Sequence, residues 1–302
     1  MRLVNTAVID IGTNTLLLLI VDEAARPVVD LARFGRLGKG LDASGELAPD
    51  AIANSLEICR EYRRVMDEHG VTTPIVIATQ ATREARNARE FVQPAEAILG
   101  ATIEVIAGTR EADLAFTAVA RTFPELAGTS YLVVDVGGGS TELIVTDGSR
   151  VVSAVSVPIG AVRLTERHLK HDPPASEEVK ALIADIDGQL DKLALPTGVP
   201  IVATAGTATT MAAMQLGLES YDPEAVTGFR MEQGAIDALL GVLAMTTVNA
   251  RKLIPGLEPQ RADVIAGGVA IYSRVMARIQ APVLITCDRG IRWGVAYERL
   301  AT

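Results

Sequence analysis

Two similar turns constrain the fold of this chain more than any other feature of its sequence. The first turn, Asp10–Thr15, separates the apolar runs Ala7–Ile9 and Leu16–Val21. The second turn, Asp135–Glu142, follows Tyr131–Val134 and again precedes an apolar run. Each stretch reads as a strand that ends in an acid, a tight turn and a second strand. The duplication predicts two related α/β units.

The residues of both turns are suited to binding a phosphate chain. Glycine lets backbone N–H groups approach an anion closely, hydroxyl groups add donors, and a carboxylate can hold a divalent cation. Two such turns facing each other across a cleft would hold a phosphate chain from both sides. The side chains and amides that we expect to bind phosphate oxygens are Thr13, Asn14, Gly137, Gly138, Gly139 and Ser140.

Familiar nucleotide-binding motifs do not account for these turns. A dinucleotide fingerprint needs a helix after its turn, but an apolar strand follows here and Glu142 replaces the last glycine. The segment most similar to a Walker A loop is Gly35–Gly40, in which Lys39 is followed by glycine instead of Ser or Thr. For Gly137–Gly139 taken alone, an ordinary hairpin remains an alternative.

Three acids are candidate ligands for a divalent cation. Asp10 and Asp135 end apolar strands, where a carboxylate is costly unless it is partnered or bound to a metal. Mg²⁺ typically takes one or two carboxylates together with waters and phosphate oxygens. We therefore expect Mg²⁺, or Mn²⁺ in its place, at Asp10 and Asp135. Glu142 either ligates the metal or positions the attacking water, and both roles stay open.

Length and composition indicate the class of protein. A chain of 302 residues with 49% hydrophobic and 22% charged residues suggests two globular α/β domains. We place them at residues 1–126 and 127–302, with the final helix free to pack back on the first domain. The net charge of −9 disfavours nucleic acid and membranes as partners, and two cysteines imply no disulfide framework. The expected location is the cytoplasm.

Hydrophobic periodicity predicts further elements between and after the turns. Residues 81–99 read as a helix with a break at Pro94, on which Arg83, Arg86 and Arg89 could share one flank. Residues 259–279 read as one long helix. Gly206 and Thr207 lie between a strand and the N-terminus of a helix, which is a common anion site.

Taken in order, these residues resemble the exopolyphosphatase/guanosine pentaphosphate phosphohydrolase (Ppx/GppA) family over essentially the whole chain. Each motif is modest alone, but their ordered combination is highly specific. The motifs are the Asp10 turn, Ala78–Arg83, Gly108–Ala112, the Asp135–Glu142 turn, Ala205–Thr210 and Asp288–Arg292. Longer relatives carry additional C-terminal helical domains, and we expect this chain to be the short two-domain form.

The resemblance implies a two-domain, actin-like ATPase fold, a duplicated ribonuclease H-like arrangement with an interdomain cleft. It also implies Mg²⁺-dependent hydrolysis of a terminal phosphoanhydride bond. Glu111 matches the family's catalytic glutamate, the second acid of Gly-x-Glu-Glu-Ala, and Arg83 matches its substrate-side arginine. Arg110 departs from the pattern because the family has its first acid at this position. Without the resemblance, Glu111 could equally be a helix N-terminal carboxylate.

Several functions remain to be separated. Exopolyphosphatase and guanosine pentaphosphate 5′-phosphohydrolase share one reaction class, and an aromatic content of 4% leans toward polyphosphate because few rings are available to stack on a base. A sugar or acetate-type kinase would need an acceptor pocket and an adenosine site. A non-catalytic polyphosphate or nucleotide sensor is the last alternative, and a homodimer is left open. Neither cysteine has an arginine six positions later, so a cysteine-phosphatase loop is absent.

Overall fold

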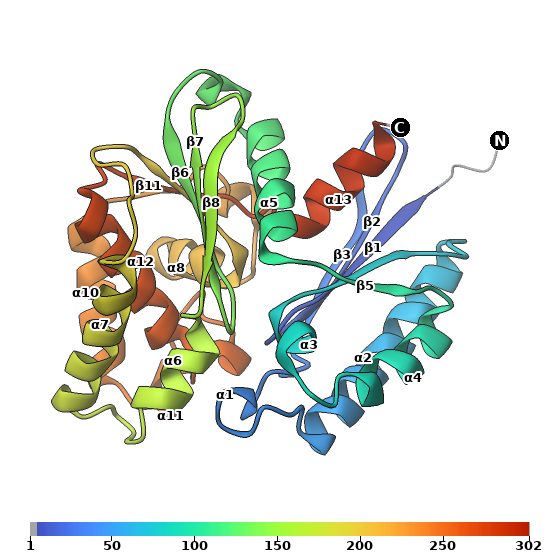
Figure 1. Ribbon diagram of the computed structural model, residues 1–302, viewed down its shortest axis with the longest axis horizontal. Helices are drawn as coiled ribbons and strands as arrows, with labels where there is room; N and C mark the ends of the chain where they lie inside the picture. The colour runs from blue at the N-terminus through green and yellow to red at the C-terminus, as the bar shows by residue number, and fades with distance from the viewer. Residues whose placement is uncertain (1–4, 302) are drawn as a thin grey trace. The chain divides into compact units, whose positions relative to one another are not determined.

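A computed structural model describes residues 5–301 as two compact units (Figure 1). The first unit ends at Ala118 and resumes at Ile291, and the second unit comprises Val119–Gly290. The sequence placed the boundary at 126/127, in the Pro- and Gly-containing loop. The chain instead leaves the first unit inside helix α5 (Gly108–Thr122), which runs on unbroken past Ala118. The final helix belongs to the first unit.

The first unit is built on a five-stranded sheet with the order β3-β2-β1-β4-β5. Strand β1 pairs antiparallel with β2 and parallel with β4, and β4 pairs parallel with β5. The strands are β1 (Thr6–Ile11), β2 (Leu16–Val21), β3 (Pro27–Arg33), β4 (Ile75–Ala78) and β5 (Ile103–Val105). The helices are α1 (Leu41–Ser44), α2 (Pro49–Glu68), α3 (Gln80–Glu84), α4 (Arg89–Leu99), α5 and α13 (Ile291–Leu300).

Helices cover both faces of this sheet. Ile9 and Ile11 of β1 pack in a core with α2 and α4, whereas Val8 packs in a separate core with α5 and α13. Alternation along β1 therefore places the side chain of Asp10 on the face of Val8, the face covered by α5.

The second unit is built on a six-stranded sheet with the order β10-β11-β9-β6-β7-β8. Its strands are β6 (Tyr131–Val136), β7 (Thr141–Thr146), β8 (Val151–Val157), β9 (Ile201–Thr204), β10 (Arg230–Met231) and β11 (Leu284–Thr286). Its helices are α6 (Ala161–His168), α7 (Ser176–Leu190), α8 (Ala205–Leu216), α9 (Pro223–Val226), α10 (Gln233–Met245), α11 (Val248–Arg251) and α12 (Ile265–Ile279), with short 3₁₀ turns at Pro124–Leu126 and Pro259–Arg261.

The two sheets share one topology. Reading the second sheet from β8, its order β8-β7-β6-β9-β11 repeats β3-β2-β1-β4-β5, and β10 is added at the far edge. In both sheets the first three strands are antiparallel, and the next two, β4 and β5 or β9 and β11, are added in parallel. The extra strand β10 pairs antiparallel with β11. This duplicated, ribonuclease H-like arrangement confirms the predicted two-domain actin-like α/β fold. The predicted cleft stays a prediction.

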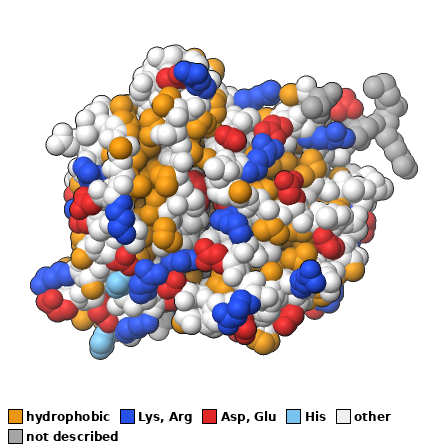
Figure 2. Space-filling view, viewed as in Figure 1, with side chains coloured by type: hydrophobic (Ala, Val, Ile, Leu, Met, Phe, Trp, Pro, Cys, Tyr) orange, Lys and Arg blue, Asp and Glu red, His pale blue; other side chains and the backbone are white. Residues whose placement is uncertain are grey.

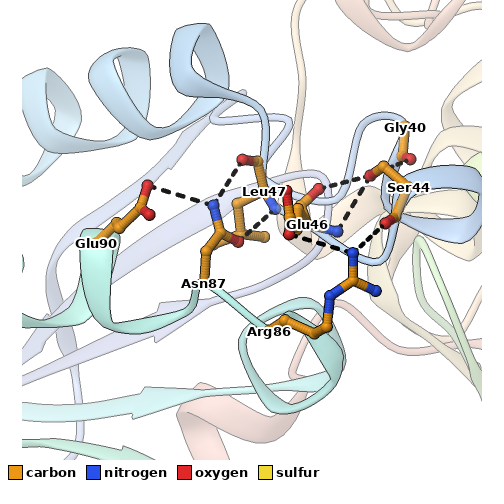
Figure 3. A network of polar contacts seen from close by, with 7 residues as sticks. All are labelled: Gly40, Ser44, Glu46, Leu47, Arg86, Asn87 and Glu90. Atoms are coloured by element: carbon orange, nitrogen blue, oxygen red, sulfur yellow. Dashed lines mark hydrogen bonds and ion pairs between the residues drawn. The ribbon is translucent and has the colours of Figure 1, made fainter.

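The predicted helix over residues 81–99 is wrong in one respect, because it breaks at residues 85–88 and not at Pro94. Ala85 takes an extended conformation, and the next two side chains bind the α1 loop (Figure 3). Asn87 accepts from Leu47 N at 2.8 Å, and Arg86 donates to Ser44 O at 2.9 Å. These long-range bonds override the helical pattern. The three arginines spaced by three residues therefore share no helix flank.

The predicted helix over 259–279 also begins later, at Ile265, after the 3₁₀ turn at Pro259–Arg261.

On the surface, Figure 2 shows Lys and Arg side chains interspersed with Asp and Glu over the visible face. Of the residues that the structure describes, those with the most exposed large apolar side chains are Met245, Leu253 and Val152. Among the described residues, no helix is both long and apolar enough to span a membrane.

Candidate active site

The turn of the first unit is held from outside by the segment that follows β3. Within the turn, Gly12 N donates to Thr15 O at 2.9 Å. Gly38 N donates to Thr13 O at 2.8 Å, and Arg36 N donates to Asn14 O at 2.9 Å. A Cβ on Gly38 would lie 2.2 Å from Thr13 Cγ2, so only glycine permits this approach. The glycine-rich segment Gly35–Gly40 therefore supports the turn through backbone hydrogen bonds and is not a Walker A loop.

Thr13 faces a residue that the sequence did not single out. Its hydroxyl donates to Gln80 Oε1 at 2.9 Å, and both residues are buried. Gln80 opens helix α3 directly after β4, so the strand order brings it beside the first turn. The proton of the Thr13 hydroxyl is thus directed at Gln80, and this hydroxyl would have to exchange that bond in order to donate to a ligand.

Glu111 and Arg83 form the central charged pair of the first unit. Arg83 Nη1 lies 2.7 Å from Glu111 Oε1 and also donates to Ile106 O at 2.6 Å. The side chain of Glu111 is 8% exposed and that of Arg83 is 30% exposed. Glu111 lies in the first turn of α5, as expected, where the helix dipole favours a carboxylate. The predicted base and the predicted substrate-side arginine are thus in direct contact.

Arg110, the departure from the family pattern, does not face Glu111. Its guanidinium makes a two-pronged ion pair with Glu298 of α13, including Nη1 to Oε1 at 2.8 Å. Hydrogen bonding to Glu298 raises the pKa of Arg110, so the cation is stabilised. The positive charge of Arg110, which stands where the family has an acid, is therefore neutralised by Glu298 within the first unit.

In the second unit, helix α6 holds the glycine turn by its carbonyl groups. Gly137 O accepts from Ala161 N at 3.0 Å, and Gly138 O accepts from Val162 N at 2.8 Å. A Cβ on Gly160 would lie 2.5 Å from Gly138 O, so the helix reaches the turn only because residue 160 is glycine. Gly137 N donates to Ser140 O at 2.9 Å, so the prediction that this amide binds phosphate is wrong. Since the carbonyl groups bind the helix, the turn can offer the amides of Gly138 and Gly139 to an anion.

Four polar residues lie side by side across the carboxyl end of this sheet. Asp135 of β6 is opposite Glu142 of β7 and Thr204 of β9, and Glu142 is opposite Ser156 of β8. We call Ser156, Glu142, Asp135 and Thr204 the polar row. Glu142 Oε1 accepts from Ser156 Oγ at 2.7 Å and from Ser140 Oγ at 2.9 Å. Two carboxylates on neighbouring strands repel each other unless a cation lies near them.

Asp135 is held by a hydrogen bond from the neighbouring strand β9. Thr204 Oγ1 donates to Asp135 Oδ2 at 2.8 Å, and the Tyr272 hydroxyl donates to Thr204 O at 2.7 Å. Desolvation raises the pKa of Asp135, and the hydrogen bond from Thr204 opposes this only in part. Desolvation also raises the pKa of Tyr272 well above 10, so its hydroxyl stays a donor.

Gly206 and Thr207 lie in the first turn of α8, as predicted. Ala205, just before them, has a left-handed φ of 65°, which is unusual for a residue with a side chain and indicates local strain. A Cβ on Gly206 would lie 2.4 Å from Arg261 Nη1, so the guanidinium of Arg261 covers this helix start. Burial lowers the pKa of Arg261. An anion here would meet both the helix dipole and this cation.

The donor set for a metal is limited to carboxylates and hydroxyls. Among residues 5–301, no three His, Cys, Asp or Glu side chains gather as in a metal site built entirely from protein ligands. Mg²⁺ needs no such cage, since it commonly uses one or two carboxylates with water and phosphate. Asp135 and Glu142, opposite each other in register, fit that style.

The residues whose side chains the structure brings against predicted site residues include Gln80, Ser156, Thr204 and Arg261. Gln80 and Thr204 adjoin or belong to sequence motifs at the carboxyl ends of strands, so their position was a usable signal. Ser156 has the weaker signal of a hydroxyl residue near the end of a strand. Nothing local to Arg261 indicates its contact with Gly206, since the chain between them includes three helices.

Comparison with known proteins places this arrangement in a family. Residues 19–302 match the model of the Ppx/GppA phosphatase family. Exopolyphosphatase 2 of Mycobacterium tuberculosis strain H37Rv is 33% identical over 296 residues, covering 93% of this chain and 92% of that protein.

Two solved structures resemble the whole chain. The crystal structure of an exopolyphosphatase-like protein superposes with a TM-score of 0.91 at 34% identity and covers 99% of each chain. The Aquifex aeolicus member of the Ppx/GppA family superposes with a TM-score of 0.81 at 32% identity, covering 99% of this chain and 98% of that one.

Proposed function

The chain belongs to the Ppx/GppA phosphatase family, and we propose that it is an exopolyphosphatase that releases terminal orthophosphate from inorganic polyphosphate. The relatives named above support this substrate, and the residues of the site support the chemistry. Hydrolysis of a phosphoanhydride needs an in-line water, a carboxylate that orients or deprotonates it, and donors around the phosphoryl group. This chain has residues suited to each of these tasks.

The observation that carries the proposal is the buried contact between Glu111 and Arg83 at 2.7 Å. We assign the proton acceptor to Glu111 and the binding of the terminal phosphoryl group to Arg83. The water oxygen attacks the terminal phosphorus, and its proton passes to the Glu111 carboxylate. The bond to the bridging oxygen breaks, and the shortened polyphosphate leaves with the electron pair.

Other residues would bind the remaining phosphate oxygens. We assign this role to the amides of Gly138 and Gly139. The hydroxyl of Ser140 would take part by exchanging its hydrogen bond to Glu142 for one to a phosphate oxygen. In the first unit we assign it to Thr13 and Asn14. Gly206 and Thr207, at the start of α8 beside Arg261, would bind phosphates further along the chain.

Asp135 and Glu142 fit a divalent cation by their register and by the cost of leaving both charges uncompensated. Mg²⁺ or Mn²⁺ held there would neutralise charge that develops on phosphate oxygens. Asp10, which ends the corresponding strand of the first unit, is proposed as an additional metal-side carboxylate. The cytoplasmic location stays a prediction, and hydrolysis of guanosine pentaphosphate stays the alternative function.

The test is phosphate release by the purified protein with Mg²⁺, comparing polyphosphates of several lengths, guanosine pentaphosphate and ATP. Glu111→Gln keeps the shape of the side chain but removes the base, so we expect kcat to fall by about 10²- to 10⁴-fold with KM nearly unchanged. Asp113→Asn, an exposed acid on the same helix, is the matched control and should keep the wild-type rate.

Each outcome of this test is informative. A wild-type rate in Glu111→Gln would show that the base is assigned wrongly. Release from guanosine pentaphosphate alone would replace polyphosphate by the nucleotide as substrate. Tight binding of polyphosphate without release from any substrate would make the protein a sensor.

A further inference from the structure

We infer that the ion pair between Arg110 and Glu298 positions Glu111 by fixing the orientation of α5 on α13, and that Glu298 is thereby a positioning residue for the reaction. This inference rests on the proposed role of Glu111. It assigns a function to the residue at which this chain departs from its family pattern.

Helices α5 and α13 meet closely at one point. A Cβ on Gly294 would lie 2.2 Å from Leu114 O and 2.9 Å from Leu114 Cα, so α13 packs directly against the backbone of α5. A single crossing point fixes the distance between two helices but leaves them able to pivot about it. A second attachment is needed to define the angle.

The ion pair provides that second attachment one turn away on each helix. Arg110 lies four residues before Leu114, and Glu298 lies four residues after Gly294, so each pair shares one helix face. Both carboxylate oxygens of Glu298 bind the guanidinium, which restricts rotation more than a single bond would.

Away from the ion pair, the two helices share a core, in which Leu114 and Ala118 of α5 lie with Trp293 and Tyr297 of α13. Arg110 and Glu298 line a groove of about 270 Å³ whose apolar wall includes Ile77, Ile106 and Val295. Because a groove lies at the level of Arg110 and Glu298 in place of close packing, the ion pair joins the two helices on this side of their crossing point. The side chains of the pair are 41% and 40% exposed, so its effect on overall stability should be small.

A small rotation of α5 about the crossing point is enough to misplace Glu111. Glu111 precedes Leu114 by three residues, about 4.5 Å along the helix, so a pivot of about 10° shifts it by about 0.8 Å. Misplacement of a catalytic group by about 1 Å can cost up to about 100-fold in rate. Loss of the pair should therefore lower kcat while KM for polyphosphate changes little.

The experiment is a charge swap measured by phosphate release. Arg110→Glu places two carboxylates together, although it restores the acid typical of the family, and we expect kcat to fall at least about 10-fold. Glu298→Arg should act similarly, and the isosteric Glu298→Gln should lower kcat about 3- to 5-fold. The double variant Arg110→Glu/Glu298→Arg should recover to within about 2-fold of wild type.

The matched control is the pair formed by Arg33 and Glu61, which lies in the same unit. Its side chains are 42% and 37% exposed and its guanidinium also binds with two nitrogens. Glu61→Gln should leave kcat unchanged. Thermal unfolding of every variant separates misplacement of Glu111 from loss of the fold.

The inference is overturned if Glu298→Gln keeps the wild-type kcat, or if the folded double variant remains as slow as Arg110→Glu. The Glu111→Gln variant is assayed alongside. If it is inactive while the Glu298 variants keep the wild-type rate, only the positioning role falls. If it keeps the wild-type rate, the assignment of the base fails and this inference fails with it.

Discussion

The turns at Asp10 and Asp135 have the same backbone plan but different neighbours. Each ends a central strand that pairs antiparallel with the next strand and parallel with a later one. At the level of Asp135, the neighbouring strands carry Glu142, Ser156 and Thr204. At the level of Asp10, they carry apolar residues, Leu17, Ala32 and Ile77.

This difference indicates that a duplicated fold need not carry duplicated chemistry. The second unit concentrates carboxylates and hydroxyls in the polar row, which suits a cation and phosphate oxygens. In the first unit the polar contacts of the predicted site residues lie away from the level of Asp10, where Thr13 meets Gln80 and Arg83 meets Glu111. We therefore expect the two acids, despite their similar sequence context, to respond differently to substitution.

The largest expected effect separates the two acids by their part in Mg²⁺ binding. Asp135→Asn should lower kcat/KM at about 1 mM Mg²⁺ by about 100-fold or more, whereas Asp10→Asn should lower it about 10-fold. The check is a Mg²⁺ titration of phosphate release, together with the Mg²⁺-induced rise in melting temperature. Equal losses in both variants would mean that the apolar residues beside Asp10 on the neighbouring strands do not make Asp10 a weaker metal ligand than Asp135.

A smaller effect is expected for Ser156, which supports Glu142 from the next strand. Ser156→Ala gives the polar row an alanine at the position where the first unit has Ala32. We expect about 10-fold weaker Mg²⁺ activation, which is typical of losing a hydrogen-bond partner of a metal ligand. Ser153→Ala on the opposite face of β8 is the matched control. The Mg²⁺-induced melting shift provides a measure of binding independent of activity, and an unchanged shift in Ser156→Ala would remove this residue from the metal site.

The smallest effect concerns stability without Mg²⁺. Desolvation raises the pKa of Asp135 in the folded protein, so its ionisation at neutral pH disfavours folding. Asp135→Asn should therefore raise the melting temperature at pH 7 by about 3 °C. The gain should shrink as pH falls through the raised pKa and vanish below the ordinary value of 3.8, where the wild-type carboxyl is also neutral. A melting temperature lowered at pH 7 would contradict this account of Asp135.

Much of the fold could be predicted because its elements are encoded locally. The strand–turn–strand units around Asp10 and Asp135 follow from apolar runs bounded by turn residues, and Glu111 was correctly expected at the start of a helix. The helix break at residues 85–88 was missed. It depends on bonds from Arg86 and Asn87 to the α1 loop, about 40 positions away in sequence.

By itself, the sequence determined the family, the α/β class, the duplicated turns and most of the residue types of the candidate site, because these depend on local pattern and on ordered motifs. Only the tertiary structure decided which side chains meet. Thr204 reaches Asp135 across 69 positions, and Glu298 reaches Arg110 across 188. Such pairs depend on strand order and helix crossing, and no periodicity along the chain encodes them. The partner of Arg110 was therefore hidden in the sequence, although the departure itself was plain.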